Sequence, residues 1–261
     1  MEQKIIYYDD ELNNEFASDN ITPKKIDGSY KYVRKGFFKF LTHIFWYRII
    51  ACPIAFFYLK LKFRHKIVNK KLLKKYKNDS YFIFGNHTHN LCDAVIPTMI
   101  NGMKDTYIIV HPNNVSIPYV GKVAPSLGAI PLPDDKEATK NFMDCIKYRV
   151  EKKKAICIYP EAHIWPFYTH IRPFKNTSFR YAVEYNKPVF CFTNVYLKRK
   201  KGNKPKIVTY VDGPFFFDKN MSKAEAREHL RNQCYNAMVE RSKLNTIEVI
   251  KYVKKGSEEI D

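Results

Sequence analysis

From residue 80 onward, short apolar runs of strand length alternate with segments of helical pattern. The runs are nearly continuous in apolar residues, which is typical of strands covered on both faces of a sheet. Two of the intervening segments open on helix-capping sequences, Asp134-x-x-Glu137 and Ser222-x-x-Glu225. The alternation predicts an α/β domain over residues 78–261, with a mainly parallel sheet flanked by helices. We expect strands at residues 81–84, 106–110, 155–159, 189–196 and 206–211.

The composition is that of a folded and strongly basic chain. Of 261 residues, 45% are hydrophobic and 15% aromatic, which excludes a disordered chain because disorder requires few apolar residues. The 45 Lys and Arg residues outnumber the 26 Asp and Glu residues, so the net charge is +19. This charge predicts an anionic partner: nucleic acid, a lipid surface or a phosphorylated substrate. The six cysteines form no Cys-x-x-Cys pair, and we expect them to be reduced and buried.

An aromatic and apolar segment precedes this domain, at residues 37–63. Its longest uncharged run, residues 49–59, has 11 residues, whereas a membrane span needs about 20. Nine Lys and Arg residues follow between Lys60 and Lys77. This order favours a helix lying in the interface of an anionic membrane, and the alternative is a buried core helix followed by a solvated basic one. We therefore expect an irregular polar arm over residues 1–30, without a cleavable signal, and a membrane-associating helical segment over residues 31–77.

The most informative polar stretch follows the first expected strand. Asn86-His87-Thr88-His89 crosses a loop, and a helical pattern follows. Side chains at the carboxyl end of a parallel strand lie where α/β sheets form their sites, and His is suited to act as a general base. Asp93 is the nearest carboxylate that can orient such a base. His89 and Asp93 share a helix face, whereas His87 reaches Asp93 only by folding back from the loop, so both pairs are candidates.

A second polar loop follows the strand expected at residues 155–159. It carries Glu161, His163, Arg172 and Lys175. This loop lies beside the first one if the two strands are parallel neighbours. Arg172 and Lys175 are able to hold a phosphate group, and Glu161 either binds a hydroxyl group or organises the loop.

In their order along the chain, these residues resemble the motifs of the glycerolipid (lysophospholipid) acyltransferase family. Asn86-His87, with Asp93, resembles a first motif of Asn-His followed by Asp. Tyr159-Pro160-Glu161 resembles the start of a third motif, Phe-Pro-Glu-Gly, and Pro173-Phe174-Lys175 resembles the Pro-Phe-Lys that follows it. Residues 127–132 and 187–190 resemble the second and fourth motifs. The resemblance spans about residues 80–195.

Three positions depart from the pattern of the family. Five residues separate His87 from Asp93, where the family usually has four. Pro133-Asp134 stand where an Arg commonly closes the second motif. Ala162 and His163 stand where the third motif has Gly and Arg. The acceptor alcohol is therefore left open.

The resemblance implies acyl transfer from an acyl thioester (acyl-CoA or acyl-carrier protein) to the hydroxyl group of a lysolipid or related alcohol. His87 would activate that hydroxyl group and Asp93 would orient the imidazole. Asn86, Glu161, His163, Arg172 and Lys175 are the expected substrate-binding residues. We expect no metal, no cofactor besides the acyl thioester, and no nucleic acid partner. A lipid substrate would place the protein at an anionic membrane surface, on the cytoplasmic face, as a peripheral or monotopic protein.

Two other classes of function are compatible with parts of the sequence. A metal-dependent hydrolase could draw ligands from the His-x-His sequence at residues 87–89, although the spacing matches no closed zinc pattern. A non-catalytic basic module that binds membranes would account for the charge, but it has no need of an Asn-His loop with an Asp behind it.

Overall fold

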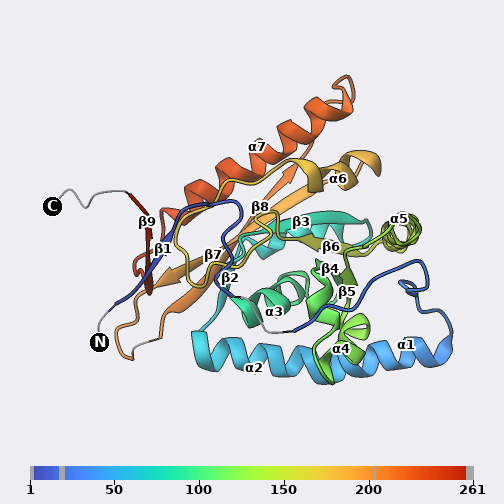
Figure 1. Ribbon diagram of the computed structural model, residues 1–261, viewed down its shortest axis with the longest axis horizontal. Helices are drawn as coiled ribbons and strands as arrows, with labels where there is room; N and C mark the ends of the chain where they lie inside the picture. Colours follow the sequence, from blue (N-terminus) through green and yellow to red (C-terminus); the bar gives the residue numbers. More distant parts are fainter. Residues whose placement is uncertain (1–2, 18–20, 203, 257–261) are drawn as a thin grey trace.

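The computed structural model describes residues 3–17, 21–202 and 204–256. In this part of the chain the main sheet has seven strands, and Figure 1 shows it running through the centre of the molecule. In spatial order the strands are β2 (Lys66–Val68), β8 (Lys206–Phe215), β7 (Val189–Leu197), β3 (Tyr81–Gly85), β6 (Ala155–Ile158), β4 (Thr106–Val110) and β5 (Ala129–Pro131).

The sheet confirms the predicted α/β class. The five neighbouring strands β7, β3, β6, β4 and β5 are all parallel, and each of the five expected strands is present. β8 pairs antiparallel with β7, and β2 pairs parallel with β8. We did not expect β2 and β5, because three residues carry no readable period. β2 lies within the segment that we assigned to the membrane, so that segment also contributes to the sheet.

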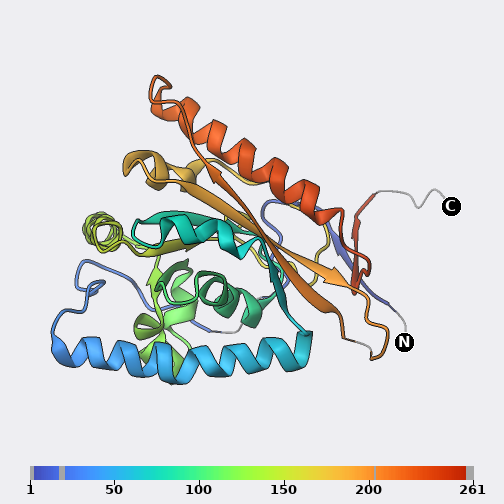
Figure 2. The same cartoon turned by 180° about the vertical axis from the view of Figure 1, so that it is seen from behind.

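Helices cover both faces of the sheet (Figures 1 and 2). On one face, α2 (Cys52–Phe63) and α3 (Asn90–Asn101) bury residues such as Phe63 and Ile96 against the strands. On the other lie α5 (Lys136–Glu151), α6 (Arg180–Glu184) and α7 (Lys223–Ser242), with Phe142 and Leu230 in the core. All six cysteines are free, and five of them are buried. Two apolar layers therefore hold the central strands, as continuous apolar runs require.

One of the two predicted helix caps is confirmed, and the other is shifted by one residue. Ser222 and Glu225 form a reciprocal capping box at α7. At α5 the cap is Asp135, whose side chain accepts from the Ala138 amide. Asp134, the residue that we expected there, instead accepts a hydrogen bond of 2.6 Å from the Ile26 amide.

The N-terminal arm is more ordered than expected. β1 (Lys4–Tyr8) pairs in parallel with β9 (Ile250–Lys254), forming a separate two-stranded sheet. The expectation of an irregular arm over residues 1–30 is therefore wrong for β1, because its partner strand lies at the other end of the chain. Residues 1–2 and 18–20 of the arm lie outside the described residues.

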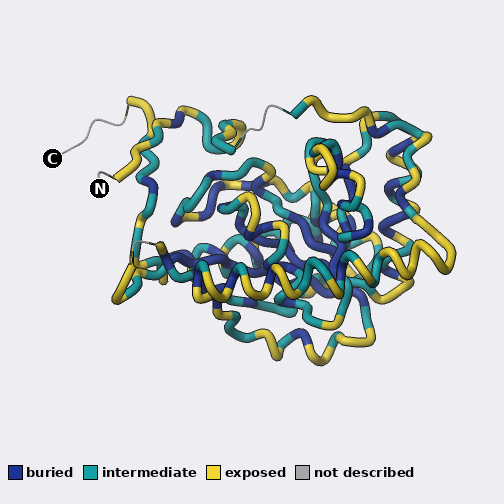
Figure 3. Tube along the Cα trace, turned by 90° about the horizontal axis from the view of Figure 1, so that it is seen from below, coloured by how far each residue is buried: buried dark blue, intermediate teal, exposed yellow. Residues whose placement is uncertain are grey.

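The aromatic segment forms one continuous helix, Phe37–Phe63, made of α1 (Phe37–His43), the π-helical η1 (Ile44–Ala51) and α2. This is the one helix in the described part of the chain that is long and apolar enough to cross a membrane, by length and composition. The helix has 27 residues, so the uncharged run of 11 residues was too short a measure of its length. Only 11% of its most apolar window is buried. Figure 3, seen from the side of this helix, shows exposed residues recurring along it.

Polar contacts fix this helix against the domain. The Tyr47 hydroxyl group accepts from the Thr106 amide at 2.9 Å. Arg48 donates to the Gly102 carbonyl at 2.7 Å and pairs with Asp105. The helix therefore runs along the domain surface rather than away from it (Figures 1 and 2).

Candidate active site

The site lies where three neighbouring strands end. β7, β3 and β6 are adjacent and parallel, so their carboxyl ends meet at one edge of the sheet. The loop after β3 carries His87, and α3 follows it with Asp93 in its first turn. The loop after β6 carries Glu161 and Arg172, and β7 contributes Asn194. The two polar loops are therefore neighbours, as their parallel strands require.

His87 and Asp93 are in direct contact. The distance from His87 Nδ1 to Asp93 Oδ2 is 2.8 Å, and the same oxygen accepts from the His89 amide at 2.9 Å. The Asp93 side chain is 1% exposed, whereas that of His87 is 17% exposed. The first turn of a helix favours a carboxylate, because unpaired amides point towards it. With Nδ1–H donating to Asp93, the imidazole has Nε2 free to accept a proton.

Of the two pairs that the sequence left open, the structure joins the side chains of His87 and Asp93. His89 Nδ1 instead accepts from the Cys92 amide at 3.3 Å, so His89 caps α3. Burial lowers the pKa of His89, with the charge of Asp93 opposing this effect. His89 has extended backbone angles (φ −163°, ψ 113°), and this extended residue accommodates the fifth position between His87 and Asp93.

Tyr159 restricts the imidazole from one side. Its ring stacks on that of His87, with centroids 4.3 Å apart and planes 18° apart. The Tyr159 hydroxyl group donates to the Asp93 carbonyl at 2.6 Å. Burial raises the pKa of Tyr159 well above its ordinary value, so this hydroxyl group stays protonated. Tyr159, the first residue of the third motif, therefore contacts both His87 and Asp93 and restricts their positions.

A buried polar chain continues behind Asp93, and the sequence reading missed it. Asn194 Nδ2 donates to Asp93 Oδ1 at 3.4 Å. The Asn194 Oδ1 atom accepts from the Thr209 hydroxyl group at 2.7 Å, and His65 Nε2 lies 2.8 Å from that hydroxyl oxygen. Because Thr209 donates to Asn194, it accepts from His65 Nε2–H. The sequence feature that could have indicated this chain is Thr193-Asn194, a polar pair inside an otherwise apolar strand.

Glu161 and Arg172 organise the loops. Glu161 Oε2 accepts from the His87 amide at 3.0 Å, and Oε1 accepts from the Arg172 amide at 3.2 Å. Both side chains are fully buried, with 3.5 Å between Glu161 Oε2 and Arg172 Nη2. Burial raises the pKa of Glu161, while the charge of Arg172 opposes this effect. Of the two roles open for Glu161, the geometry fits the organisation of the loop and not the binding of a substrate hydroxyl group.

The family model for acyltransferases matches residues 64–195, which is half of the chain and includes every residue of this polar cluster up to Asn194. The chain belongs to the acyltransferase family. It is therefore an enzyme that transfers acyl groups. The N-terminal arm and the whole helix Phe37–Phe63 precede the matched region.

The fold of this acyltransferase is similar to that of a solved bacterial enzyme. The crystal structure of the 1-acyl-sn-glycerophosphate (LPA) acyltransferase PlsC from Thermotoga maritima aligns with a TM-score of 0.54. The two chains are 18% identical, and the alignment covers 80% of this chain and 81% of the other. No curated protein matches this chain in a sequence search. At this identity the likeness concerns the fold.

Two of the expected substrate-binding residues of this acyltransferase have no surface for a substrate. The Arg172 guanidinium group donates to the carbonyls of Glu161, His163 and Glu11, and it stacks 4.9 Å from the Trp165 ring. Its assignment as a phosphate ligand is therefore corrected, because all of this contact is with the protein itself.

Asn86, also expected to bind substrate, is buried and bonds the backbone of Asn194 with both amide atoms, at 2.8 and 3.1 Å. It fastens the His87 loop to β7. Like Glu161 and Arg172, Asn86 therefore stabilises the loop that carries His87.

The structure does not bring His163 and Lys175 into the cluster either. His163 Nδ1 bonds Glu15 Oε2 at 3.0 Å, near the surface. Lys175 is exposed, and its neighbour Asn176 bonds Glu228 in α7. Both side chains lie outside the polar cluster and are accessible to solvent, so their substrate-binding role stays a prediction.

The departures from the third motif have a backbone consequence. Ala162, which stands where the family has Gly, adopts φ +63°. This left-handed conformation disfavours side chains with a Cβ. The turn after Glu161 therefore keeps the shape that Gly would give it, at a cost in strain.

No group of three His, Cys, Asp or Glu side chains within residues 3–17, 21–202 and 204–256 is close enough to hold a metal ion. His87 bonds Asp93, His89 caps a helix and His163 bonds Glu15. The His-x-His sequence therefore does not form the ligand set that a metal-dependent hydrolase would need.

Proposed function

We propose that this acyltransferase moves a fatty acyl group from an acyl thioester, acyl-CoA or acyl-carrier protein, to the hydroxyl group of a lysolipid at a membrane surface. The observation that carries the proposal is the contact between His87 Nδ1 and Asp93 Oδ2, which leaves the second nitrogen of a partly exposed imidazole free. The Thermotoga maritima enzyme is named for a lysophospholipid, 1-acyl-sn-glycerophosphate, and this supports the same class of acceptor here.

In the proposed mechanism His87 acts as a general base. Nε2 takes the proton of the acceptor hydroxyl group as its oxygen attacks the thioester carbonyl carbon. Asp93 holds Nδ1–H and stabilises the imidazolium that forms. When the tetrahedral intermediate collapses, the C–S bond breaks and the imidazolium returns its proton to the thiolate. The products are an ester and a free thiol, and no acyl-enzyme intermediate is required.

Several groups would keep this geometry fixed between turnovers. The His89 amide and the Asn194 side chain bind the two oxygens of Asp93, and Glu161 holds the His87 amide. Their hydrogen bonds are made before substrate arrives, so binding energy need not be used to assemble the base. Backbone amides near the start of α3 are the proposed donors to the oxyanion.

The proposed membrane contact is the exposed face of the helix Phe37–Phe63. Phe38 is 79% and Leu61 78% exposed, and further exposed apolar side chains follow the same helix: Phe37, Phe40, Leu41, Phe45, Ile49, Ile54, Phe56 and Phe57. An apolar stripe of this length is unusual on a soluble surface and fits burial in a bilayer interface. Since Tyr47 and Arg48 tie the opposite side of the helix to the domain, the helix would lie in the membrane plane, on the cytoplasmic side, in a monotopic or peripheral arrangement.

An acceptor screen tests the proposal. Purified protein receives one isotope-labelled acyl-CoA and, in parallel, a panel of lysolipids and polyols, and mass spectrometry identifies the esters. We expect an acylated lysolipid whose formation depends on the acceptor and is unchanged after treatment with a chelator. Release of free fatty acid at the same rate with every acceptor would contradict the proposal.

A further inference from the structure

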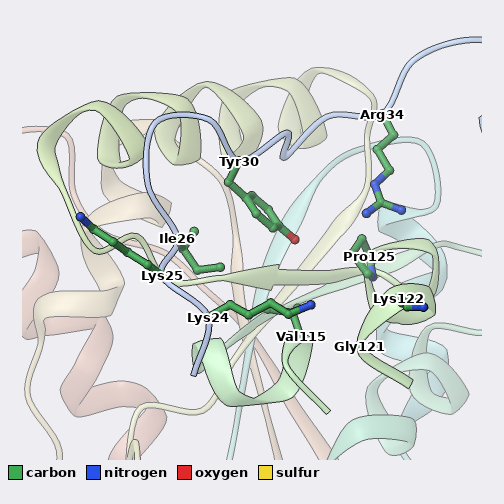
Figure 4. A pocket seen from close by; sticks show the side chains of 9 residues that line it. All are labelled: Lys24, Lys25, Ile26, Tyr30, Arg34, Val115, Gly121, Lys122 and Pro125. Atoms are coloured by element: carbon green, nitrogen blue, oxygen red, sulfur yellow. The ribbon is translucent and has the colours of Figure 1, made fainter. Parts of the chain in front are cut away.

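A basic cavity lies outside the site described above. Its volume is about 300 Å³, and it opens between residues 24–34, which precede the helix Phe37–Phe63, and residues 115–125, which follow β4. Four cationic side chains line it together with Ile26, Tyr30, Val115, Gly121 and Pro125 (Figure 4): Lys24, Lys25, Arg34 and Lys122. Two distant stretches of sequence thus bring like charges to one place.

The cationic side chains of this cavity form no ion pair within the described part of the chain. Among the residues that the structure describes, no carboxylate lines the cavity either. Like charges in one cavity repel one another, and that repulsion is relieved when an anion enters. The arrangement therefore favours an anionic ligand.

Tyr30 supplies an independent indication of a ligand. Its hydroxyl oxygen is inaccessible to solvent and has no hydrogen-bond partner among the described residues. In Figure 4 this oxygen points into the space between Lys24 and Arg34, whereas the Lys25 ammonium group points away from that space. Buried hydroxyl groups without a partner are uncommon, and such a group beside cations is a ready donor to an anion.

The cavity walls are held in place. The Lys24 amide donates to Ser116 Oγ at 2.8 Å, which ties the first stretch to the second. The Ile26 amide and carbonyl both bond Asp134. On the other wall, a Cβ on Gly121 would lie 2.3 Å from the Val115 carbonyl oxygen, so the turn is packed as tightly as Gly allows. The backbone of the cavity walls is therefore fixed, and the exposed side chains of Lys24, Arg34 and Lys122 extend from it.

The cavity adjoins the proposed membrane helix. Pro125 belongs to η4 (Ala124–Leu127), which packs against α1 and η1. His43 Nδ1 in α1 lies 2.7 Å from the carbonyl oxygen of Ser126, the residue after Pro125. Arg34 is three residues before the start of α1. An anion in this cavity would thus lie beside the helix whose apolar face we place in the bilayer.

We propose that this cavity binds the phosphate group of an anionic phospholipid headgroup, held by Lys24, Arg34 and Lys122 and by the Tyr30 hydroxyl group. A bound headgroup would fix the depth and orientation of the helix Phe37–Phe63 in the membrane. The inference rests on the membrane contact proposed above, but not on acyl transfer.

Vesicle binding tests this inference, with variants of the full-length protein. The measurement is co-sedimentation with vesicles of phosphatidylcholine alone or with a minor fraction of phosphatidylglycerol. Tyr30→Phe changes no charge, and we expect it to lower binding to the anionic vesicles at least about tenfold, because a hydrogen bond to a charged group contributes about 1.5–3 kcal/mol. Lys24→Gln should lower this binding at least about tenfold, because both a contact and a charge are lost.

Lys25→Gln is the matched control, because it removes the same charge from the next residue. Lys25→Gln should lower vesicle binding by no more than about fivefold, which is the contribution of the diffuse attraction between one lysine and an anionic membrane. Equal losses in Lys24→Gln and Lys25→Gln, with wild-type binding by Tyr30→Phe, would mean diffuse charge and would overturn the inference.

A second arm separates a lipid headgroup from a soluble phosphate compound. Calorimetric titration with glycerol phosphate should show weak binding that Tyr30→Phe weakens further, alongside the loss of vesicle binding. Binding of glycerol phosphate without any effect of the variants on vesicles would overturn the headgroup assignment. Binding to neutral vesicles and transfer to a soluble acceptor, measured on the same variants, report separately on the helix and on the active site.

Discussion

The polar cluster at the strand ends and the exposed face of the helix Phe37–Phe63 depart from ordinary protein surfaces in opposite directions. In the cluster, ionisable side chains such as Asp93 and Glu161 are buried. On the helix, large apolar side chains such as Phe38 and Leu61 are exposed. Both arrangements cost free energy in water, and each is balanced by something specific: hydrogen bonds in the first case and, by our proposal, lipid in the second.

The two regions also differ in what secures them. In the cluster, the contacts among Asp93, Asn194, Glu161 and Arg172 are made within the domain. The helix is secured on one side only, through residues such as Tyr47 and Arg48. Changes in the cluster should therefore reduce catalysis, whereas changes on the exposed helix face should reduce membrane binding and leave stability unchanged.

The largest effect is expected from Asp93→Asn. The amide keeps the size of the side chain but cannot stabilise the imidazolium, and its NH₂ group opposes the Nδ1–H tautomer of His87. We expect kcat for acyl transfer to fall about 10³-fold with an unchanged circular dichroism spectrum. A decrease in kcat of less than tenfold would show that Asp93 does not take part in the proposed mechanism.

The second prediction concerns vesicle binding by the exposed face of the helix Phe37–Phe63. Replacing Phe38, Ile54 and Leu61 together by Gln should lower vesicle binding about 100-fold or more, because each buried apolar side chain contributes about 1.5–3 kcal/mol. Their exposure means that the free energy of unfolding in solution should change by less than about 0.5 kcal/mol per residue. Strong destabilisation without loss of vesicle binding would make this face part of a protein interface instead.

A smaller effect is expected from Thr209→Val, which removes the hydrogen bond to Asn194 but touches neither His87 nor a substrate. Loosening Asn194 should lower kcat about tenfold, the equivalent of one hydrogen bond, with KM unchanged. Thr209→Ser keeps the hydroxyl group and should restore the rate. A change in KM, or no rescue by Ser, would assign Thr209 a purely structural role.

The last prediction concerns stability in acid and leaves the catalytic rate aside. Burial, with the charges of Lys60 and Lys70, lowers the pKa of His65 from 6.5 to about 4. Between these values the unfolded chain binds more protons than the folded one, so stability falls as the pH is lowered through this window, by about 3 kcal/mol in total. His65→Gln should flatten the decline between pH 6.5 and pH 4 in denaturant titrations. An equally steep decline in the variant would exclude His65 as its source.

Sequence reasoning recovered those parts of the fold that long local patterns specify. β3, β6 and β7 are buried along almost their whole length and therefore read as continuous apolar runs. β1 and β9 were missed because their pairing joins opposite ends of the chain. Each of these strands also mixes charged and apolar residues, so neither reads as a continuous apolar run. β2 and β5 are three residues long, too short for any period to be recognised.

For the site, the sequence located the loops but not the roles of their side chains. Arg172 and Glu161 have residue types typical of ligand binding, and only their burial shows that they bond the protein itself. The choice between His87 and His89 depended on the extended backbone at His89, which residue spacing does not determine. Asn194 comes to Asp93 only through the pairing of β3 with β7.

The most direct test of the central claim compares His87→Ala with His89→Asn, a replacement that retains a helix-capping side chain. The measurement is the initial rate of acyl transfer to the best acceptor, at matched protein concentration and with folding verified. We expect His87→Ala to lose about 10³-fold in rate and His89→Asn to stay within about threefold of the wild type. A His87→Ala variant that keeps its rate, or a His89→Asn variant that loses it, would contradict the account.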